Sequence, residues 1–319
     1  MMQPMRRLFT SGLKEKIGRL WKTKFIKDAL YLYSGRAINL IVGLWSVLFF
    51  GVLFNTLQIA IISLFEMVAE LFLSFGFAWS NLGLVRFGKE EILRYDKLNQ
   101  TLSTRLMITF PLLGVSILLI LCFKAQLMLF LGSEDTALLY YLIADIVLLV
   151  GHDHITHLLT ALERHSRNAF FFLCQSISRL ILLACFYFGF MHTSAELFLK
   201  ATVAFQLFLM IIRVQHIRTR DIWPVIWVNW QEVKRFLKFV YPQIYGFTGL
   251  YVINWVDVYF IRKNCSIDAL GAYQFLYSIF IKIGSFAVLL NTLLLPRVIE
   301  WKMKRFDRLL QYLQKVPLP

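Results

Sequence analysis

The stretch LMITFPLLGVSILLILCF, residues 106–123, runs without a single charged side chain. A helix needs about 20 mostly apolar residues to cross the hydrocarbon core of a bilayer, so this stretch predicts a membrane-spanning helix. Hydrophobic residues make up 58% of the chain and the mean hydropathy is +0.63, above the 45–50% that is usual in soluble domains. Similar segments predict further spans at residues 29–53, 58–84, 136–162, 169–191, 195–212, 236–261 and 270–295. The sequence thus predicts an all-α integral membrane protein of about eight transmembrane helices.

Positive charge is distributed unevenly around these predicted spans. Of the 34 lysines and arginines, only four lie in predicted loops on the side of the membrane opposite the N-terminus: Lys124, Lys200, Arg262 and Lys263. Such asymmetry follows the positive-inside rule, in which basic residues stay on the cytoplasmic side of a membrane. We therefore expect a multi-pass protein of the cytoplasmic (inner) membrane with both termini in the cytoplasm. The net charge of +15 does not predict a nucleic-acid partner, because the basic residues flank spans and form no separate domain.

The predicted spans divide the chain into five segments. Residues 1–28 alternate apolar and basic side chains at helical spacing, which predicts an amphipathic helix on the cytoplasmic membrane surface or, as the alternative, a solvated basic tail. Residues 29–212 hold six spans, and residues 213–235 form a cytoplasmic linker that contains WPVIWVNW. Spans 7 and 8 follow within residues 236–296. The tail, 297–319, predicts a second interfacial helix.

Two charged residues are predicted near the middle of the bilayer on neighbouring antiparallel spans. Arg179 lies roughly 15 Å deep and Asp145 roughly 14 Å deep, at 1.5 Å per helical residue. A charge at this depth costs about 2.5–3.5 kcal/mol and marks a functional site unless it is paired. We favour a structural Asp145–Arg179 ion pair over a role of these residues in transport.

Charges on the first two predicted spans form a second group. Arg36 and Glu70 come to a similar level in the bilayer, so they are expected to pair. Glu66 lies one helical turn from Glu70 on the same face and is left spare. A carboxylate without a partner at this depth can carry a proton. Coupling to a proton or cation and simple packing are equally supported for Glu66 and Glu70.

Lys282 is predicted roughly 18 Å into the last span. No carboxylate on the preceding span reaches that level, since Asp257 lies too near the outer surface. An unpaired lysine at the midplane is expected to face a water-filled cavity or an anionic ligand. Lys282 is therefore the leading candidate for substrate contact, with a structural role as the alternative.

The sequence GHDHITH, residues 151–157, has the composition of a metal site but not its spacing. Only Asp153 and His157 share a helical face, and zinc usually takes three protein ligands or more. The polar inner end of a span explains this motif better. We expect no metal and no cofactor.

The segment from residue 239 to residue 297 has a recognisable order of features: Pro242 opening a helix, VDVYFI near the outer end, a short loop with SIDALGAY, and a helix ending at Pro296. This order resembles spans 7 and 8 of the polysaccharide (O-antigen or oligosaccharide) flippases, within the multidrug/oligosaccharidyl-lipid/polysaccharide exporter superfamily. The segments SGRAINLIVGL (residues 34–44) and LSFGFAWSNLGLVRFGKEE (residues 73–91) are similar to the first span and to the end of the second span of that family.

The resemblance implies a two-lobe fold like that of the multidrug and toxin extrusion (MATE) transporters, with a complete six-helix N-terminal lobe and the first two helices of a second lobe. It implies translocation of a polyprenyl-diphosphate-linked oligosaccharide for surface polysaccharide biosynthesis, with the polysaccharide-assembly machinery as a possible partner. Lys282, Arg36 and Arg179 are then expected to bind the diphosphate. Glu66, Glu70, Asp145 and Asp257 are the candidates for ion coupling, and no catalytic residue is expected. The family has more spans than this chain, which predicts a C-terminally truncated member.

Three other functions remain open at the level of sequence. A multidrug exporter of the same fold needs an acidic cavity for its cations, whereas the predicted pairs leave this cavity basic. A membrane-embedded enzyme of sugar-lipid assembly usually presents a large polar loop or clustered catalytic residues, and the predicted outer loops are short. A non-functional remnant would be absent from membranes.

Overall fold

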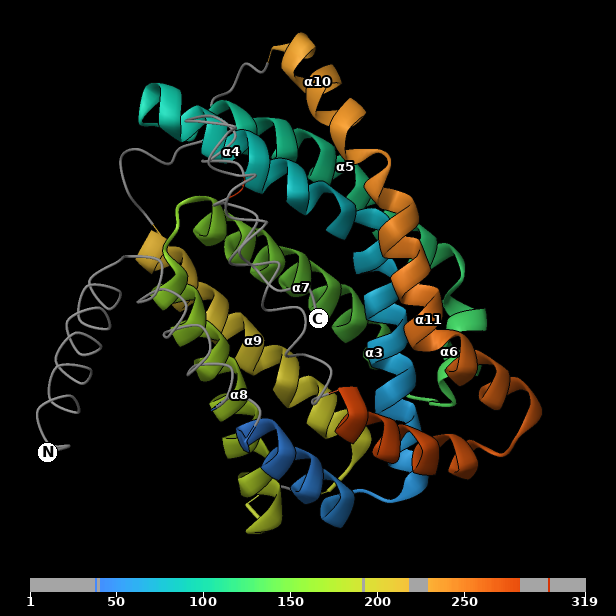
Figure 1. Ribbon diagram of the computed structural model, residues 1–319. Helices are drawn as coiled ribbons and strands as arrows, with labels where there is room; N and C mark the ends of the chain where they lie inside the picture. Colours follow the sequence, from blue (N-terminus) through green and yellow to red (C-terminus); the bar gives the residue numbers. More distant parts are fainter. Residues whose placement is uncertain (1–37, 39–40, 191–192, 218–228, 282–297, 299–319) are drawn as a thin grey trace, which may run out of the picture.

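The computed structural model describes residues 38, 41–190, 193–217, 229–281 and 298. Every regular element within these residues is helical, and the long helices run alongside one another in a slanted bundle (Figure 1). The predicted all-α class is therefore confirmed. The amphipathic segment predicted at residues 1–28 and nearly all of the tail at 297–319 lie outside the described residues, as do Arg36 and Lys282.

The helices follow in chain order with short connections. A first helix, Ile41–Leu53, precedes α3 (Thr56–Gly76), the short 3-10 helix η1 (Ala78–Ser80), α4 (Asn81–Tyr95), α5 (Gln100–Cys122), α6 (Lys124–Leu131), α7 (Ala137–Ala161), α8 (His165–Tyr187), α9 (Ala195–Ile217), α10 (Trp230–Val240) and α11 (Gln243–Asn264). The last described helix is Ile267–Ile281.

Six helices in this part of the chain are long and apolar enough to cross a membrane: α3, α5, α7, α8, α9 and α11. The shorter apolar helices Ile41–Leu53 and Ile267–Ile281 lie where the first and the last predicted span are expected. The rest of those two spans falls outside the described residues. By the length and composition of its helices the protein is therefore membrane-embedded, with six helices of membrane-spanning length in the described residues where eight spans were expected.

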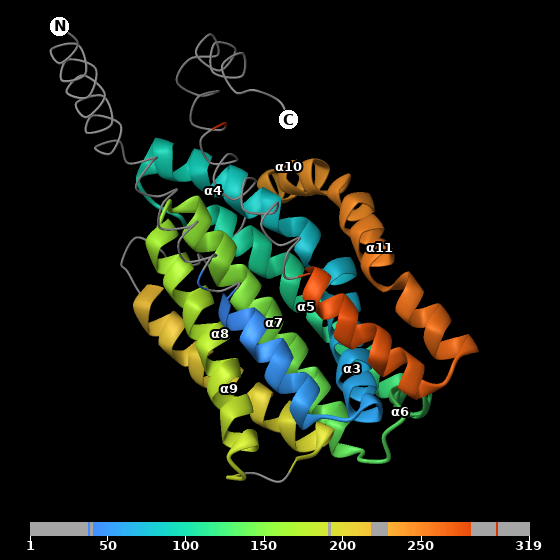
Figure 2. The same cartoon turned by 60° about the horizontal axis from the view of Figure 1, so that its bottom comes forward.

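The central element is α3, because a larger share of its apolar segment is buried inside the protein than in any of the other five membrane-length helices. It begins with a capping box, in which the Asn55 side chain accepts a hydrogen bond from the Gln58 amide while the Gln58 side chain accepts one from the Asn55 amide. Its side chains, together with those of α7 and α9, form the largest hydrophobic cluster of the described residues. Figure 2 shows α3 beside α7 and α5, with α11 on its outer side. Because α3 touches helices from both ends of the chain, it positions the cavity described below.

The predicted second span, 58–84, does not exist as one helix. Helix α3 ends at Gly76 because Phe77 leaves the helical conformation, with φ −133° and ψ −40°. The turn is held by side chains: the Ser80 hydroxyl donates to the Phe77 carbonyl at 2.7 Å and the Trp79 indole to the Phe75 carbonyl at 3.0 Å. A separate helix, α4, then continues in a new direction. The apolar pattern runs on through this turn, which is why the sequence pattern did not show it.

The predicted linker at 213–235 is also partly helical. Helix α9 continues to Ile217, and α10 begins at Trp230 with a side-chain cap from Asn229. The predicted seventh span, 236–261, is interrupted at Tyr241 and Pro242, since proline has no N–H to continue the ladder of α10. A short helix, α6, lies in the predicted loop between the third and fourth spans, and Gly132, with a positive φ of 70°, caps its C-terminal end.

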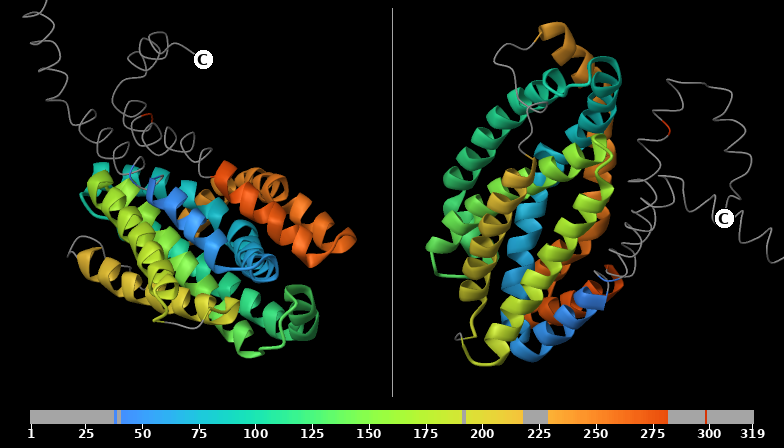
Figure 3. Two further views of the ribbon diagram at one scale, coloured as in Figure 1. Left: turned by 90° about the horizontal axis from the view of Figure 1, so that it is seen from below. Right: turned by 90° about the vertical axis from the view of Figure 1, so that its left-hand side faces the viewer.

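The first and the last described helices lie together along one side of the bundle (Figure 3). Helix Ile41–Leu53 packs on α8 and α9 through the ring pairs Phe49–Tyr187 and Phe50–Phe198, with centroids 5.3 and 5.7 Å apart. A methyl group at Gly51 would collide with the Phe275 ring of the last helix. Glycine there allows helices from the two ends of the chain to meet and to enclose a cavity between them.

Candidate functional site

A cavity of about 190 Å³ lies where the helices from the two ends of the chain meet. Five helices contribute to its wall: Ile41–Leu53, α3, α8, α11 and Ile267–Ile281. Its polar lining includes Ser46, Ser63, Glu66, Ser176, Arg179 and Gln274, and its aromatic lining includes Phe50, Trp255, Phe275 and Tyr277. Two of the residues that the sequence predicted as functional, Glu66 and Arg179, are therefore brought into one site.

Glu66 and Arg179 form an ion pair inside this cavity. The Arg179 Nη2 atom of α8 lies 3.3 Å from the Glu66 Oε1 atom of α3. On α3, Glu66 is exposed although its neighbours Phe65 and Met67 are buried. The side chains of the pair keep 41% and 46% of their accessible surface, so both charged groups remain open to a molecule that enters the cavity.

The predicted Asp145–Arg179 pair is wrong. Arg179 pairs with Glu66, whereas Asp145 is a buried residue of α7 with 6% of its surface exposed. The prediction compared only depth in the bilayer. Depth gives the position along each helix but not the rotation about its axis, and this rotation turns Arg179 toward α3.

The prediction for the first two spans is wrong in one part. Glu66, expected to be the spare carboxylate, is the one with a basic partner. Glu70, one turn along α3, is half-buried and accepts a hydrogen bond from the Ser74 hydroxyl at 3.5 Å. Its expected partner, Arg36, lies outside the described residues, so an Arg36–Glu70 pair stays a prediction.

The two predicted residues of the last helical hairpin have different positions. Asp257 of α11 accepts a hydrogen bond from the Tyr273 hydroxyl, which ties α11 to the helix that follows. It is not among the residues that line the cavity. Lys282 lies outside the described residues, and in the sequence it directly follows Ile281, which does line the cavity.

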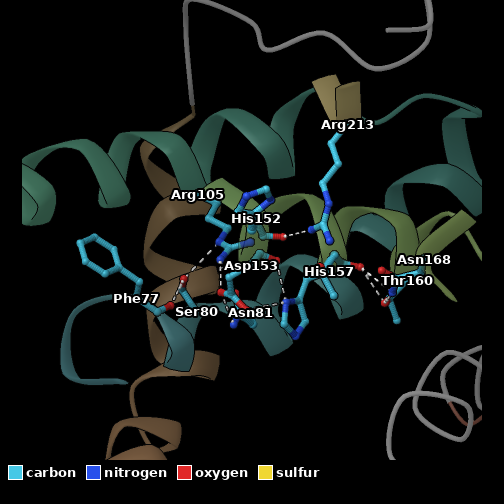
Figure 4. Close-up of polar contacts among 11 residues, drawn as sticks. Phe77, Ser80, Asn81, Arg105, His152, Asp153, His157, Thr160, Asn168 and Arg213 are labelled. Atoms are coloured by element: carbon cyan, nitrogen blue, oxygen red, sulfur yellow. Dashed lines mark hydrogen bonds and ion pairs between the residues drawn. The ribbon is translucent and has the colours of Figure 1, made fainter. Parts of the chain in front are cut away.

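A second polar cluster lies at the turn between α3 and α4, and we call it the buried network. It consists of Ser80, Asn81, Arg105, Asp153 and His157 (Figure 4). The Asp153 carboxylate accepts from Asn81 at 2.7 Å and lies 3.5 Å from the Arg105 guanidinium and 3.2 Å from His157 Nδ1. Arg105 also donates to the Ser80 hydroxyl and to the Asn81 side-chain oxygen.

Sequence reasoning missed the arginine at the centre of this network. It placed Arg105 one residue before a span, in a cytoplasmic loop, whereas the structure includes it in α5 with 1% of its surface exposed. The shared face of Asp153 and His157 is confirmed by their contact. Within the described ranges, no cluster of three or more histidine, cysteine or acidic side chains has metal-binding geometry. In the sequence, the only signal for the network was the polar GHDHITH motif on an otherwise apolar helix.

A further buried arginine, Arg213, holds α9 against α7. Sequence reasoning assigned it to the linker, but it lies in α9 with 2% of its surface exposed. Its Nη1 atom donates to the His152 carbonyl at 3.4 Å, and its guanidinium lies 5.2 Å from the centre of the Phe171 ring. The His152 ring meets the Gln206 carbonyl at 3.1 Å, which adds a second bond between the same two helices.

The two polar sites differ in what they can do. The members of the buried network bond mainly to one another, and a network of this kind restrains how helices pack. The cavity, in contrast, presents exposed charges, hydroxyl groups and aromatic rings, the usual lining of a ligand site. Comparisons of the chain with protein-family models, with curated proteins and with solved structures gave no match.

Proposed function

We propose that this protein is a lipid-linked glycan flippase, which moves a polyprenyl-diphosphate-linked oligosaccharide across the cytoplasmic membrane by alternating access around the cavity. The observation that carries the proposal is the exposed Glu66–Arg179 pair, in a cavity whose wall combines helices from both ends of the chain. Exposed charge at membrane depth is expensive unless it serves a water-filled pathway or a charged ligand. The order of features that resembles the polysaccharide flippases supports the same function.

The Glu66–Arg179 pair suggests how such a substrate could be taken up and released. A diphosphate offers several charged oxygens and competes with the single Glu66 carboxylate for the Arg179 guanidinium. Protonation of Glu66, or a cation bound to it, would weaken its hold on Arg179 and favour the substrate-bound arrangement. Glu66 would thereby couple ion entry to substrate binding. Arg36 and Lys282 are the further candidates for the diphosphate, and Glu70, Asp145 and Asp257 for the coupling ion.

The proposed transport requires a defined orientation in the membrane. The positive-inside distribution predicts that both termini and the α4–α5 connection lie in the cytoplasm and that the α6–α7 connection lies outside. Transport of this kind makes and breaks no bond in the glycan, so the protein would act without catalytic residues. Partners would be the bilayer, the lipid-linked glycan and the enzymes that assemble and polymerise it.

The proposal is tested in proteoliposomes. The probe is a fluorescent polyprenyl diphosphate that carries one hexose or one N-acetylhexosamine, and dithionite destroys only the dye in the outer leaflet. We expect protein-containing vesicles to lose more fluorescence than empty vesicles, Arg179→Gln to lower the rate at least tenfold, and Arg167→Gln, an exposed arginine elsewhere on α8, to keep it.

Two results would contradict the flippase. The first is a loss of fluorescence equal to that of empty vesicles for both glycolipids. The second is uptake of an organic cation such as ethidium without any movement of glycolipid, which would identify a multidrug exporter. Lys282→Glu tests the second lobe in the same assay, and an unchanged rate would remove Lys282 from the substrate contacts.

A further inference from the structure

The cavity is electrically neutral over its described lining. Glu66 and Arg179 are the charged side chains found there, and they are paired. A diphosphate carries several negative charges and needs more than one arginine that already has a carboxylate partner. A neutral polar ligand needs no such compensation. Beyond the Arg179 guanidinium, which the diphosphate would contact at the edge of the cavity, the described lining is therefore suited to an uncharged group of the substrate.

Gln274 gives the strongest sign that a ligand is expected here. It lines the cavity, yet it is 6% exposed, and its side-chain nitrogen has no hydrogen-bond partner among the residues that the structure describes. A buried donor without an acceptor is energetically unfavourable, because it has lost its hydrogen bonds to water without replacement. A hydroxyl oxygen brought into the cavity would satisfy that donor. The hydroxyl protons of Ser46 and Ser278 already go to carbonyls of their own helices, so these two serines leave Gln274 as the donor that is still to be satisfied.

Aromatic rings form the other part of the same wall. Trp255 comes from α11 and Tyr277 from the last helix. The Tyr277 ring stacks on Tyr273, with centroids 5.7 Å apart and an interplanar angle of 14°, which restrains its orientation. Flat aromatic faces beside a few directed polar groups suit a ligand whose faces are C–H groups and whose edge carries hydroxyl groups. A pyranose ring has this chemistry.

The size of the cavity limits how much of a glycan it can hold. Pockets for drug-sized ligands usually measure about 300–1,000 Å³, and this cavity measures about 190 Å³. It is large enough for one ring and too small for an oligosaccharide. We propose that it binds a single sugar ring of the lipid-linked glycan, the ring next to the diphosphate, with Gln274 donating to a ring hydroxyl group and with Trp255 and Tyr277 packing on its faces.

This subsite rests on the proposed function, and one binding experiment separates the two. The purified protein in nanodiscs is titrated with farnesyl diphosphate and with the same molecule carrying one hexose. We expect the hexose to tighten binding about tenfold, the effect of one or two additional hydrogen bonds. Gln274→Leu is expected to remove that gain while leaving the affinity for farnesyl diphosphate unchanged.

Gln243→Leu is the matched control, because Gln243 is a half-buried glutamine of α11 that does not line the cavity. The Gln243→Leu variant should still bind the hexose-carrying ligand about tenfold more tightly than farnesyl diphosphate. Equal affinity of the unmodified protein for the two ligands overturns the sugar subsite and leaves the flippase intact. Failure to bind either ligand overturns the flippase itself. The ratio measured with the unmodified protein decides the question even if the Gln274 variant does not fold.

Discussion

Arg105 shows how one residue can determine the packing of three elements. It extends from α5 and reaches Ser80 in η1 and Asp153 in α7. A charged side chain with 1% of its surface exposed is tolerated only because a carboxylate and two polar groups compensate it. The network is thus placed where the bend between α3 and α4 must be held in one geometry.

Removal of Arg105 is expected to destabilise the protein strongly. Arg105→Met leaves Asp153 without its arginine partner, and breaking a buried pair from one side costs about 3–5 kcal/mol. Thermal unfolding in detergent measures the loss. Arg94→Met, the same change at an exposed position of α4, should have little effect. Equal losses for the two variants would show that the network contributes nothing specific.

The Asp135–Lys200 pair predicts a dependence of stability on pH. Lys200 donates to the Asp135 carboxylate at 2.6 Å, and this hydrogen bond, with one from the Ala137 amide, lowers the pKa of Asp135 below its ordinary value of 3.8. A lowered folded-state pKa stabilises the protein above the ordinary value, and this contribution is lost as the pH falls through the folded value.

Asp135→Asn should accordingly lower the unfolding temperature near pH 6, and this effect should shrink as the pH falls below 3.8 and through the lowered folded-state pKa. The difference should correspond to less than about 1 kcal/mol, because both side chains are about one-third exposed. An effect of Asp135→Asn that grows as the pH falls would contradict this assignment.

At the scale of elements, α10 stands between the helices up to α9 and the last two described helices, α11 and Ile267–Ile281. Phe236 and Val240 of α10 are buried against Gly83 of α4, and Arg235 lies 2.7 Å from Glu90 of the same helix. The close approach depends on Gly83, since a Cβ atom there would lie 2.5 Å from Phe236 and Val240. The helix that leads into α11 is thereby fixed on α4.

Gly83→Ala should displace α10 and cost about 1–3 kcal/mol through overpacking. Gly114→Ala is the matched control, because it is the same change in a helix and its Cβ atom would meet nothing within 4 Å. That variant should be neutral or more stable by up to about 1 kcal/mol, owing to the better helix propensity of alanine. Unfolding in mixed detergent micelles measures both. A stable Gly83→Ala protein would mean that α10 is not fixed on α4 by this contact.

At the scale of the whole molecule, the distribution of charge predicts which side of the membrane each connection occupies. Asp96 ends α4 and Glu134 follows α6, so they lie at opposite ends of the membrane-length helices. In a background without the four native cysteines, an impermeant maleimide added to intact spheroplasts should label Glu134→Cys and not Asp96→Cys. Lysed cells should label both. The reverse pattern in intact spheroplasts would contradict the predicted orientation.

The sequence by itself determined the helical, membrane-embedded class, because hydropathy and length depend only on the order of residues along the chain. It also identified Glu66 and Arg179 as functional candidates, since a charge within an apolar run is visible without a structure. That Asp153 and His157 share a helical face also followed from helical spacing alone. These are all properties of a single helix.

Only the tertiary structure decided which helices and side chains meet. The partner of Arg179 depends on how far α8 and α3 are rotated about their axes, and no single-helix pattern encodes that rotation. The burial of Arg105 and Arg213 depends on neighbours far away in the sequence. The cavity itself is formed by helices from both ends of the chain, and Gln274 became a candidate only when its side chain was found buried beside Glu66 and Arg179.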